Sequence, residues 1–173
     1  MSNKAYLSLG SNIEPEMNLS AAVAMLAELT TLKAVSSVWE TVPLGMANQP
    51  NFLNAAALIE TELAAEQLKA QLLSPIEQKL GRVRQANKNA PRPMDIDLML
   101  FNRQIFQLGD RHIPDPEVLE RPFVAIPLAE IAPDYIHPKT GQSLKEIAAT
   151  FEEAKAGMTL RPDLSEKLRR LVP

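Results

Sequence analysis

The sequence predicts an α+β fold, a ferredoxin-like βαββαβ sandwich with an antiparallel sheet and a C-terminal extension. Short runs of alternating or continuous apolar residues, typical of strands, recur within residues 1–101. Two longer runs with apolar residues at helical spacing lie between them, which gives the order strand, helix, strand, strand, helix, strand. A proline-rich segment follows, in which we expect only short helices.

The first four elements lie between residues 5 and 61. Residues 5–9 alternate as in a strand and end at Gly10-Ser11-Asn12, a turn signal. Pro15 suits the first turn of a helix, which apolar residues continue to about Leu29. Strands are expected over 32–41 and 52–61. The connection between these strands, residues 43–51, is long for a hairpin, and long loops are often functional.

The second helix and the fourth strand complete the sandwich. Leu68, Leu72, Ile76 and Leu80 recur every four residues within a predicted helix over 64–81. Pro75 lies inside this helix and should kink it. A polar loop is expected over 82–93, and the fourth strand over 94–101. The predicted segments are, in order, 5–9, 15–29, 32–41, 52–61, 64–81 and 94–101.

The remainder of the chain is expected to contain short elements. Residues 103–113 suit a short extended segment, and Ser143 to Phe151 suits one more helix. From Gly157 onward the chain is polar and charged, which predicts a partly disordered tail. We therefore expect one domain over residues 1–156 and a C-terminal tail over 157–173.

Composition excludes several classes of function. Of 173 residues, 46% are hydrophobic and 23% charged, as in ordinary globular proteins, and the net charge of −3 argues against a general nucleic-acid binder. The absence of cysteine excludes disulfides, thiolate metal sites and a cysteine nucleophile. The two histidines are too few for a histidine-rich metal site. No apolar run has the length of a signal peptide or a membrane span, so we expect a cytoplasmic protein with no membrane partner.

Two aspartates in the fourth strand give the strongest functional signal. Asp95 and Asp97 are two residues apart, so in a strand they share one face, whereas Met94, Ile96, Leu98 and Leu100 would face a core. Two like charges on a half-buried face repel each other and lose hydration, so a positive partner is required. Mg²⁺ suits such a pair, and the arginines just upstream suit the phosphates that accompany it. Those basic residues are Arg82, Arg84, Lys88 and Arg92.

Simpler explanations exist for each of these residues. The two aspartates could form a structural ion-pair cluster with Arg82, Arg84 or Arg92. Glu77 lies on the polar side of its helix and is by default at the surface. Phe52 and Phe123 are more often core residues than ligand platforms, and these alternatives stay open on the sequence alone.

Asn54 is unusual within an apolar strand because asparagine is depleted there. If it is buried, its amide must form hydrogen bonds, which would suit either the edge of a heterocycle or a neighbouring backbone group.

Several short motifs, in order, resemble the 6-hydroxymethyl-7,8-dihydropterin pyrophosphokinase family. The resemblance extends from Tyr6 to about Pro133, most of the chain, and the motifs are specific only in combination. They are Leu9-Gly10-Ser11-Asn12, Thr41-Val42-Pro43-Leu44-Gly45, the run from Gln49 to Ala56, Ile76-Glu77 with Gly81-Arg82, the run from Pro91 to Asp97, Arg121-Pro122-Phe123, and the run from Pro127 to Pro133.

The resemblance implies an ATP-dependent pyrophosphokinase of folate biosynthesis, in which the hydroxyl of the pterin attacks the β-phosphorus of ATP and AMP leaves. Asp95 and Asp97 would hold two Mg²⁺ ions, and Arg82 and Arg92 would steady the phosphates. Nucleotide contacts would come from Glu77, Arg84, Arg92 and Arg121, and pterin contacts from Thr41, Pro43, Leu44, Phe52, Asn54 and Phe123. The expected partners are the pterin and ATP, with neighbouring folate-pathway enzymes as candidates.

Two residues depart from the pattern of that family. Asn89 occupies a position where the family commonly has tryptophan, and Asp115 one where it commonly has histidine. These departures motivate one alternative, a pterin-binding relative with weak or no kinase activity. A second alternative, from another enzyme class, is a nucleotidyltransferase or glycosyltransferase that uses the same pair of aspartates.

Overall fold

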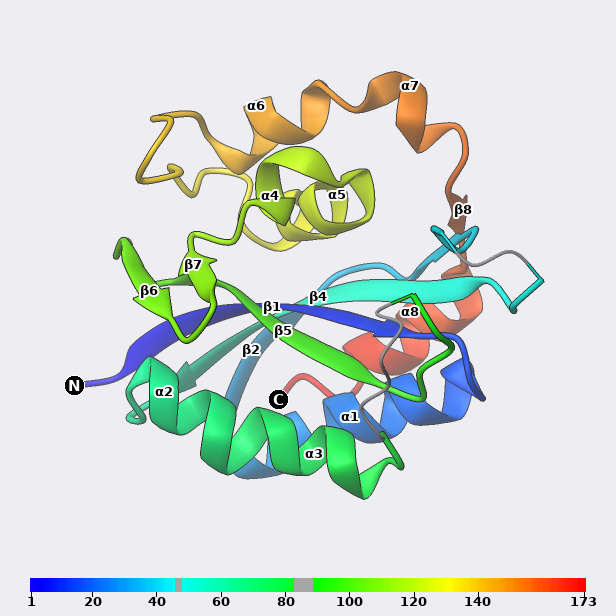
Figure 1. Cartoon of the computed structure of the whole chain (residues 1–173), viewed down its shortest axis with the longest axis horizontal. Helices are drawn as coiled ribbons and strands as arrows, with labels where there is room; N and C mark the ends of the chain where they lie inside the picture. The colour runs from blue at the N-terminus through cyan, green and yellow to red at the C-terminus, as the bar shows by residue number, and fades with distance from the viewer. Residues whose placement is uncertain (46–47, 83–88) are drawn as a thin grey trace.

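A six-stranded antiparallel sheet forms the centre of the protein in a computed structural model that describes residues 1–45, 48–82 and 89–173 (Figure 1). Its order is β5-β1-β4-β3-β8, and β2 pairs with β4 next to β3. The βαββαβ order and this topology confirm the predicted sandwich. The strands are β1 (Asn3–Ser11), β2 (Thr31–Val35), β3 (Trp39–Thr41), β4 (Phe52–Thr61), β5 (Asp95–Phe101) and β8 (Thr159–Leu160), with a separate hairpin of β6 (Phe106–Leu108) and β7 (Arg111–Ile113).

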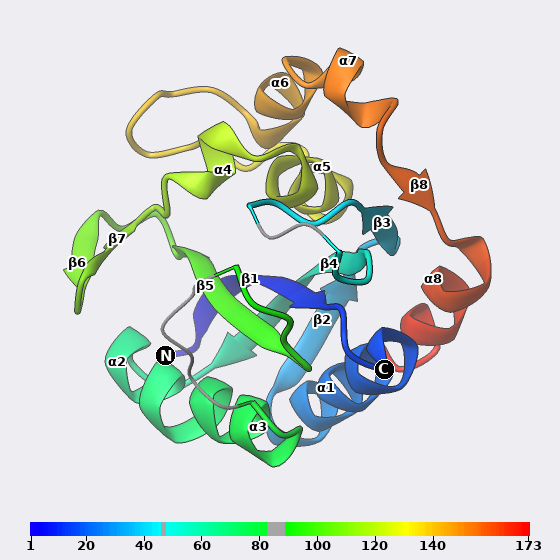
Figure 2. The same cartoon turned by 45° about the vertical axis from the view of Figure 1, so that its right-hand side comes forward.

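Helices cover both faces of this sheet (Figures 1 and 2). One face packs against α1 (Pro15–Leu29), α2 (Ala65–Leu68), the π-helical segment η1 (Lys69–Leu73), α3 (Ser74–Lys79) and α8 (Pro162–Arg169). The opposite face lies beneath α4 (Glu117–Glu120), α5 (Pro122–Ile131), α6 (Leu144–Ala149) and α7 (Glu152–Lys155). Among the described residues, no helix is long and apolar enough to cross a bilayer.

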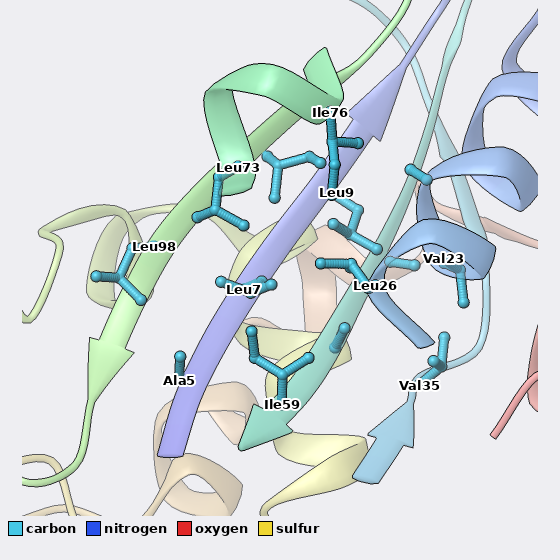
Figure 3. Close-up of a cluster of buried hydrophobic side chains, with 14 of the residues drawn as sticks. Ala5, Leu7, Leu9, Val23, Leu26, Val35, Ile59, Leu73, Ile76 and Leu98 are labelled. Carbon is cyan, nitrogen blue, oxygen red and sulfur yellow. The ribbon is translucent and has the colours of Figure 1, made fainter. Parts of the chain in front are cut away.

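The larger hydrophobic core lies between the sheet and helices α1 and α3 (Figure 3). Leu7 and Leu9 from β1 point toward Leu26 and Ile76 from these helices, and all four are essentially inaccessible to solvent. Each fully buried side chain of this size contributes about 1.5–3 kcal/mol to the hydrophobic stabilisation. This layer gives the site at the end of the sheet a rigid base.

A bulge in β5 corrects the prediction for Leu100. Leu7 pairs with Leu98 and Tyr6 with Leu100, so Met99 is an extra residue in β5. Side chains beyond the bulge change faces, because one added residue inverts the alternation. Leu98 therefore faces the α1–α3 core as predicted, as do Met94 and Ile96, whereas Leu100 lies in the second core beneath α5.

The predicted strand over residues 32–41 is divided into β2 and β3. The interruption is at Ser36, whose side-chain oxygen accepts a hydrogen bond from the backbone N–H of Ala56 at 2.8 Å. Ser37 follows, and its N–H donates to the Glu130 carboxylate at 3.0 Å. The Ser36 side chain thus accepts the Ala56 N–H in place of a backbone carbonyl, at a point where apolar periodicity gave no warning.

Prolines are accommodated within two helices. Pro75 is the second residue of α3, directly after the π-helical segment, and proline is tolerated in the first turn of a helix because its missing N–H would have no intrahelical partner there. Pro127 lies inside the ten-residue helix α5, so the expectation of only short helices in this proline-rich segment was wrong here.

The segment after Gly157 is not a disordered tail. Strand β8 pairs with β3, and α8 inserts Leu164 and Leu168 into the larger core. The Ser165 hydroxyl accepts the backbone N–H of Val38 at 2.8 Å. The polar sequence misled because only one narrow face of α8 is apolar, so this segment belongs structurally with the sandwich.

Candidate active site

The candidate site lies at the end of the sheet where β5 begins and β1 ends. Cross-strand pairing places Asp95, Gly10, Asn54 and Trp39 in one row, on the neighbouring strands β5, β1, β4 and β3. Gly10 is the only member of this row without a side chain, and a Cβ built there would come 3.7 Å from Asn54 Oδ1. The carboxylate and the amide are therefore separated by a flat stretch of sheet.

Asp95 is held by two guanidinium groups. Arg82 Nη1 donates to Asp95 Oδ1 at 2.6 Å, and Arg92 Nη1 donates to Asp95 Oδ2 at 2.8 Å. Burial acts to raise the pKa of Asp95, but the charges of Arg82 and Arg92 outweigh it and hold the pKa below its usual range. Asp95 is thus a carboxylate at neutral pH, and the sequence-predicted partners are its actual partners.

Asp97 has a different cationic neighbour. Its Oδ1 accepts a hydrogen bond from Arg111 Nη1 at 2.9 Å. Burial, and then the negative charge of Asp95, raise the pKa of Asp97 well above its usual range, and Arg111 offsets only part of this effect. The two aspartates therefore share one face, and the negative charge on that face is not fully compensated.

Glu77 is a third carboxylate at this site and is not at the surface. Its Oε2 accepts the backbone N–H of Ile96 at 2.8 Å and lies 3.4 Å from Arg82 Nη1. Burial raises the pKa of Glu77 to about 7, and the nearby charge of Asp95 adds to the shift. Glu77 thus supports the strand between the two aspartates from the α3 side.

Asp115, one of the departures from the family pattern, is buried and paired. Its Oδ2 accepts from Arg111 Nε at 3.1 Å and from Nη2 at 2.8 Å, and its Oδ1 accepts the N–H of Glu117. Arg111 therefore links Asp115 to Asp97. The sequence analysis identified Asp115 only as a departure from the family pattern and did not anticipate its pairing with Arg111, four residues earlier.

The donor set fits magnesium. Asp95 and Asp97 present oxygens on one face, with 18% of each side chain exposed to solvent. The carboxylates of Glu77, Asp95, Asp97 and Asp115 outnumber by one the guanidiniums that contact them, within the part of the chain that the structure describes. Mg²⁺ is commonly bound by one or two carboxylates together with substrate phosphates, and this site offers such a pair.

An aromatic and amide face lies next to the carboxylates. Phe52 and Asn54 are two residues apart on β4 and so share a face, and both Phe52 and Phe123 are only half-buried. Asn54 Nδ2 donates to Thr41 Oγ1 at 2.8 Å and to Trp39 O at 3.2 Å. The Arg92 guanidinium lies 5.8 Å from the centre of the Phe52 ring, which connects this face to the Asp95 side.

The remaining predicted residues fall at the edges of the site. Pro43 is half-buried and Leu44 is exposed, at the start of the loop after β3. Arg121 is exposed at the start of α5, within electrostatic reach of Glu117. Arg84 lies outside the described residues.

Asn12 joins the two loops at this site, a role that sequence reasoning missed. Its backbone N–H donates to Arg92 O, and its side-chain oxygen accepts the N–H of Arg92 at 2.8 Å. Its side-chain nitrogen donates to Gln49 Oε1 at 2.6 Å and to Pro50 O at 3.1 Å. The sequence signals were its place in the turn after the first strand and in a family motif, and neither suggested a long-range contact for the side chain.

Asn89 lies between the same two loops. Its backbone oxygen accepts from Gln49 Nε2 at 2.7 Å, and its side chain packs against Gly45. Gly45 has a φ of 82°, which favours glycine, and a Cβ there would fall 2.3 Å from Asn89 Nδ2, so the Asn89 side chain would have to shift. Asn89 thus contacts the 43–51 loop, in a position where the family commonly carries an aromatic ring.

Paired carboxylates, converging arginines and a neighbouring aromatic and amide face, together on a ferredoxin-like sandwich, define a phosphotransferase that acts on a flat polar ring. The model of the family described as 7,8-dihydro-6-hydroxymethylpterin-pyrophosphokinase (HPPK) matches residues 6–133. The chain belongs to this family. It is an ATP-dependent pyrophosphokinase that transfers pyrophosphate to hydroxymethyldihydropterin in folate biosynthesis.

Full-length relatives agree with this assignment. The chain is 38% identical over 161 residues to the 2-amino-4-hydroxy-6-hydroxymethyldihydropteridine pyrophosphokinase of Bacillus subtilis, covering 91% of this chain and 95% of that protein. It is 39% identical over 152 residues to the pyrophosphokinase of the same name from Pseudomonas aeruginosa, covering 86% and 92%. The alternative of a nucleotidyltransferase or glycosyltransferase finds no support in these relatives.

Solved structures support the fold. A chain described as HPPK-DHPS in complex with substrates superimposes with a TM-score of 0.71 at 14% identity, covering 90% of this chain and 45% of that chain. Plasmodium falciparum HPPK-DHPS A437G gives a TM-score of 0.67 at 13% identity, covering 90% and 46%. The chain thus spans about half the length of the solved chains that it matches.

Proposed function

We propose that Asp95 and Asp97 bind two Mg²⁺ ions that accompany the triphosphate of ATP during pyrophosphoryl transfer. The observation that carries this proposal is the placement of both carboxylates on one face of β5, next to the aromatic and amide face of β4. When bound there, Mg²⁺ would neutralise charge on the phosphate oxygens and make the β-phosphorus more electrophilic.

The arginines supply the rest of the positive charge for the triphosphate. Arg82 and Arg92 each direct a guanidinium to Asp95 from the rim of the site, with about a quarter of each side chain exposed. Planar guanidinium groups match phosphate oxygens and do not titrate near neutral pH. We assign Arg84, Arg121 and Glu77 to the same nucleotide side, in agreement with the family resemblance.

The pterin occupies the opposite side in this proposal. Phe52 and Phe123 would flank the ring, since both are half-buried and retain exposed aromatic surface. Asn54, already oriented by Thr41, would read the polar edge of the ring together with the backbone of Thr41, Pro43 and Leu44. The substrate hydroxyl would then lie toward Asp95 across the flat stretch at Gly10.

Catalysis by the chain itself is mainly positioning and charge stabilisation. The pterin hydroxyl oxygen forms a bond to the β-phosphorus of ATP as the bond from that phosphorus to the α,β-bridging oxygen breaks. AMP carries this oxygen away, and the hydroxyl proton is released to water. Arg82 and Arg92 stabilise the charge that develops on the transferred group. Asn12 keeps the backbone of Arg92 and the 43–51 loop in register while this occurs.

Replacement of one metal-binding carboxylate tests this assignment. Asp97→Ala should abolish AMP formation from ATP and 6-hydroxymethyl-7,8-dihydropterin, while circular dichroism shows an unchanged fold. Asp110→Ala, in the turn between β6 and β7 and exposed, removes the same charge as a matched control and should keep wild-type turnover. Near-normal turnover in Asp97→Ala would contradict the metal assignment.

The solved chains described as HPPK-DHPS carry a second part beyond the one matched here, and this supports an additional proposal about partners. Those HPPK-DHPS chains are about twice as long as the part matched here. A neighbouring folate-pathway enzyme is therefore a candidate for association with this chain, and co-elution of the two purified proteins in gel filtration would test it. Separate elution at micromolar concentration would count against such a complex.

A further inference from the structure

Arg111 occupies a position between the metal-binding strand and a buried carboxylate. Its Nη1 donates a single hydrogen bond of 2.9 Å to Asp97, whereas Nε and Nη2 donate together to Asp115. The Arg111 side chain is 36% exposed, and that of Asp115 only 4%. Arg111 is thus firmly attached to Asp115 and more loosely attached to Asp97.

Asp115 is itself held in place on several sides. Its N–H donates to Met99 O at 2.9 Å, and its Oδ1 accepts the N–H of Glu117. The Nε and Nη2 groups of Arg111 can keep their two hydrogen bonds to Asp115 while Nη1 changes its partner. The geometry therefore provides a cation that can exchange Asp97 for another anion.

Competition at Asp97 follows from charge. A divalent cation bound by Asp97 would be a like-charged neighbour of the guanidinium, so the two are poorly accommodated on one carboxylate oxygen. The triphosphate of ATP, arriving with Mg²⁺, brings oxygens with which the released Nη1 can pair. Mg²⁺ at Asp97 and the triphosphate at Arg111 must therefore both be bound before the charges of these two side chains are compensated again.

We propose that Arg111 is a positioning residue that neutralises Asp97 in the metal-free protein and, anchored by Asp115, turns to a phosphate of the nucleotide when Mg²⁺ binds. This inference rests on the proposed function of Asp97 and assigns a role to the departure at position 115. In this proposal Asp115 fixes the position of Arg111 through two hydrogen bonds.

The proposal makes two binding affinities change in opposite directions. Arg111→Met removes the competitor, so nucleotide-free protein should bind Mn²⁺, used as a paramagnetic probe in place of Mg²⁺, more tightly. The same variant should bind Mg²⁺ with α,β-methylene-ATP more weakly. A partly exposed charged contact of this kind corresponds to an expected change of about fivefold in each dissociation constant.

Three further variants separate this role from a structural one. Arg111→Lys, which keeps the charge but not the fork, should bind Mn²⁺ as the wild type does and the nucleotide less tightly. The double variant Arg111→Met with Asp115→Asn also removes the buried Asp115 charge that Arg111→Met leaves unpaired, and it should still bind Mn²⁺ more tightly. Arg103→Met removes an exposed arginine in the turn after β5 and should change neither affinity.

The decisive measurements are Mn²⁺ titration by electron paramagnetic resonance and nucleotide titration by calorimetry. Tighter Mn²⁺ together with weaker nucleotide in Arg111→Met and in the double variant supports the proposal. Parallel loss of both affinities, or affinities equal to those of Arg103→Met, overturns it while the metal assignment stands. If Mn²⁺ binds to the wild type but Asp97→Ala binds it equally well, the assignment of Asp97 as a metal ligand fails, and the proposal with it.

Discussion

Replacement of Glu77 by glutamine should stabilise the metal-free protein at alkaline pH. Glu77 is largely buried, with 15% of its side chain exposed, and it lies close enough to Asp95 to feel its charge. Glutamine keeps an oxygen that can accept the N–H of Ile96, so the variant removes the charge and little else. The charge is unfavourable here, because burial raises the pKa of Glu77 to about 7 from 4.5.

The sign and size of the effect follow from linkage. A carboxyl whose pKa is raised on folding contributes stability that is complete below pH 4.5 and is lost as the pH rises through about 7. Each unit of pKa shift corresponds to 1.36 kcal/mol, so the free energy of unfolding of the wild type loses up to about 3 kcal/mol over this window. Glu77→Gln avoids this loss and should exceed the wild type by about 1–3 kcal/mol at pH 8.

Urea unfolding at several pH values between about 5 and about 8, in EDTA and without nucleotide, measures this difference. Glu62→Gln, an exposed glutamate before α2, serves as the matched control and should show a difference that does not depend on pH. A pH-independent difference for Glu77→Gln, or a variant less stable than the wild type at pH 8, would refute the reasoning.

Three other predictions concern Gly10, Asn12 and the packing of α8 against the larger core. Gly10→Val places a side chain on the flat stretch of sheet between Asp95 and Asn54. The KM for the pterin should therefore rise roughly tenfold or more, while the nucleotide affinity measured by calorimetry stays unchanged. An unchanged KM would contradict the placement of the pterin over Gly10. Asn12→Ala leaves the partly buried backbone groups Arg92 N–H and Pro50 O without this partner. The free energy of unfolding should fall by about 1–3 kcal/mol, and turnover should decrease. Wild-type values in both the denaturation and the AMP assay would argue against the linking role of Asn12. Leu168→Ala should lower the free energy of unfolding in urea by about 2–5 kcal/mol, whereas Leu160→Ala, at a residue that is 44% exposed, should lower it far less. Equal losses of stability in the two variants would show that α8 does not belong to the core.

Periodicity predicted the sandwich because it reports which side chains meet a shared core. The alternation around Asp95 and Asp97 located both carboxylates on one face, and the structure places them there. The same alternation failed at Leu100, since nothing in the side chains of β5 indicates the bulge at Met99. Local patterns cannot reveal an added residue whose cause lies in pairing with another strand.

Long-range polar contacts were the part of the site that sequence reasoning could not supply. The contacts of Asn12 with Arg92 and Gln49 span 80 and 37 residues, and a turn asparagine gives no sign of them. The contact of Arg111 with Asp97 spans 14 residues and forms only because β7 lies next to β5, so the strand pattern around Asp97 gave no sign of it. The polar stretch after Gly157 likewise gave a weak signal, since α8 contributes few but fully buried leucines.

The central claim is that the carboxylate pair of β5 serves pyrophosphoryl transfer to a pterin alcohol. Its most direct test is product analysis after the protein is mixed with Mg²⁺, 6-hydroxymethyl-7,8-dihydropterin and ATP labelled at the β-phosphorus. We expect AMP and a labelled pterin diphosphate in equal amounts, with both products lost in Asp97→Ala. Release of ADP or free pyrophosphate in place of AMP, or product formation that persists in Asp97→Ala, would contradict the account.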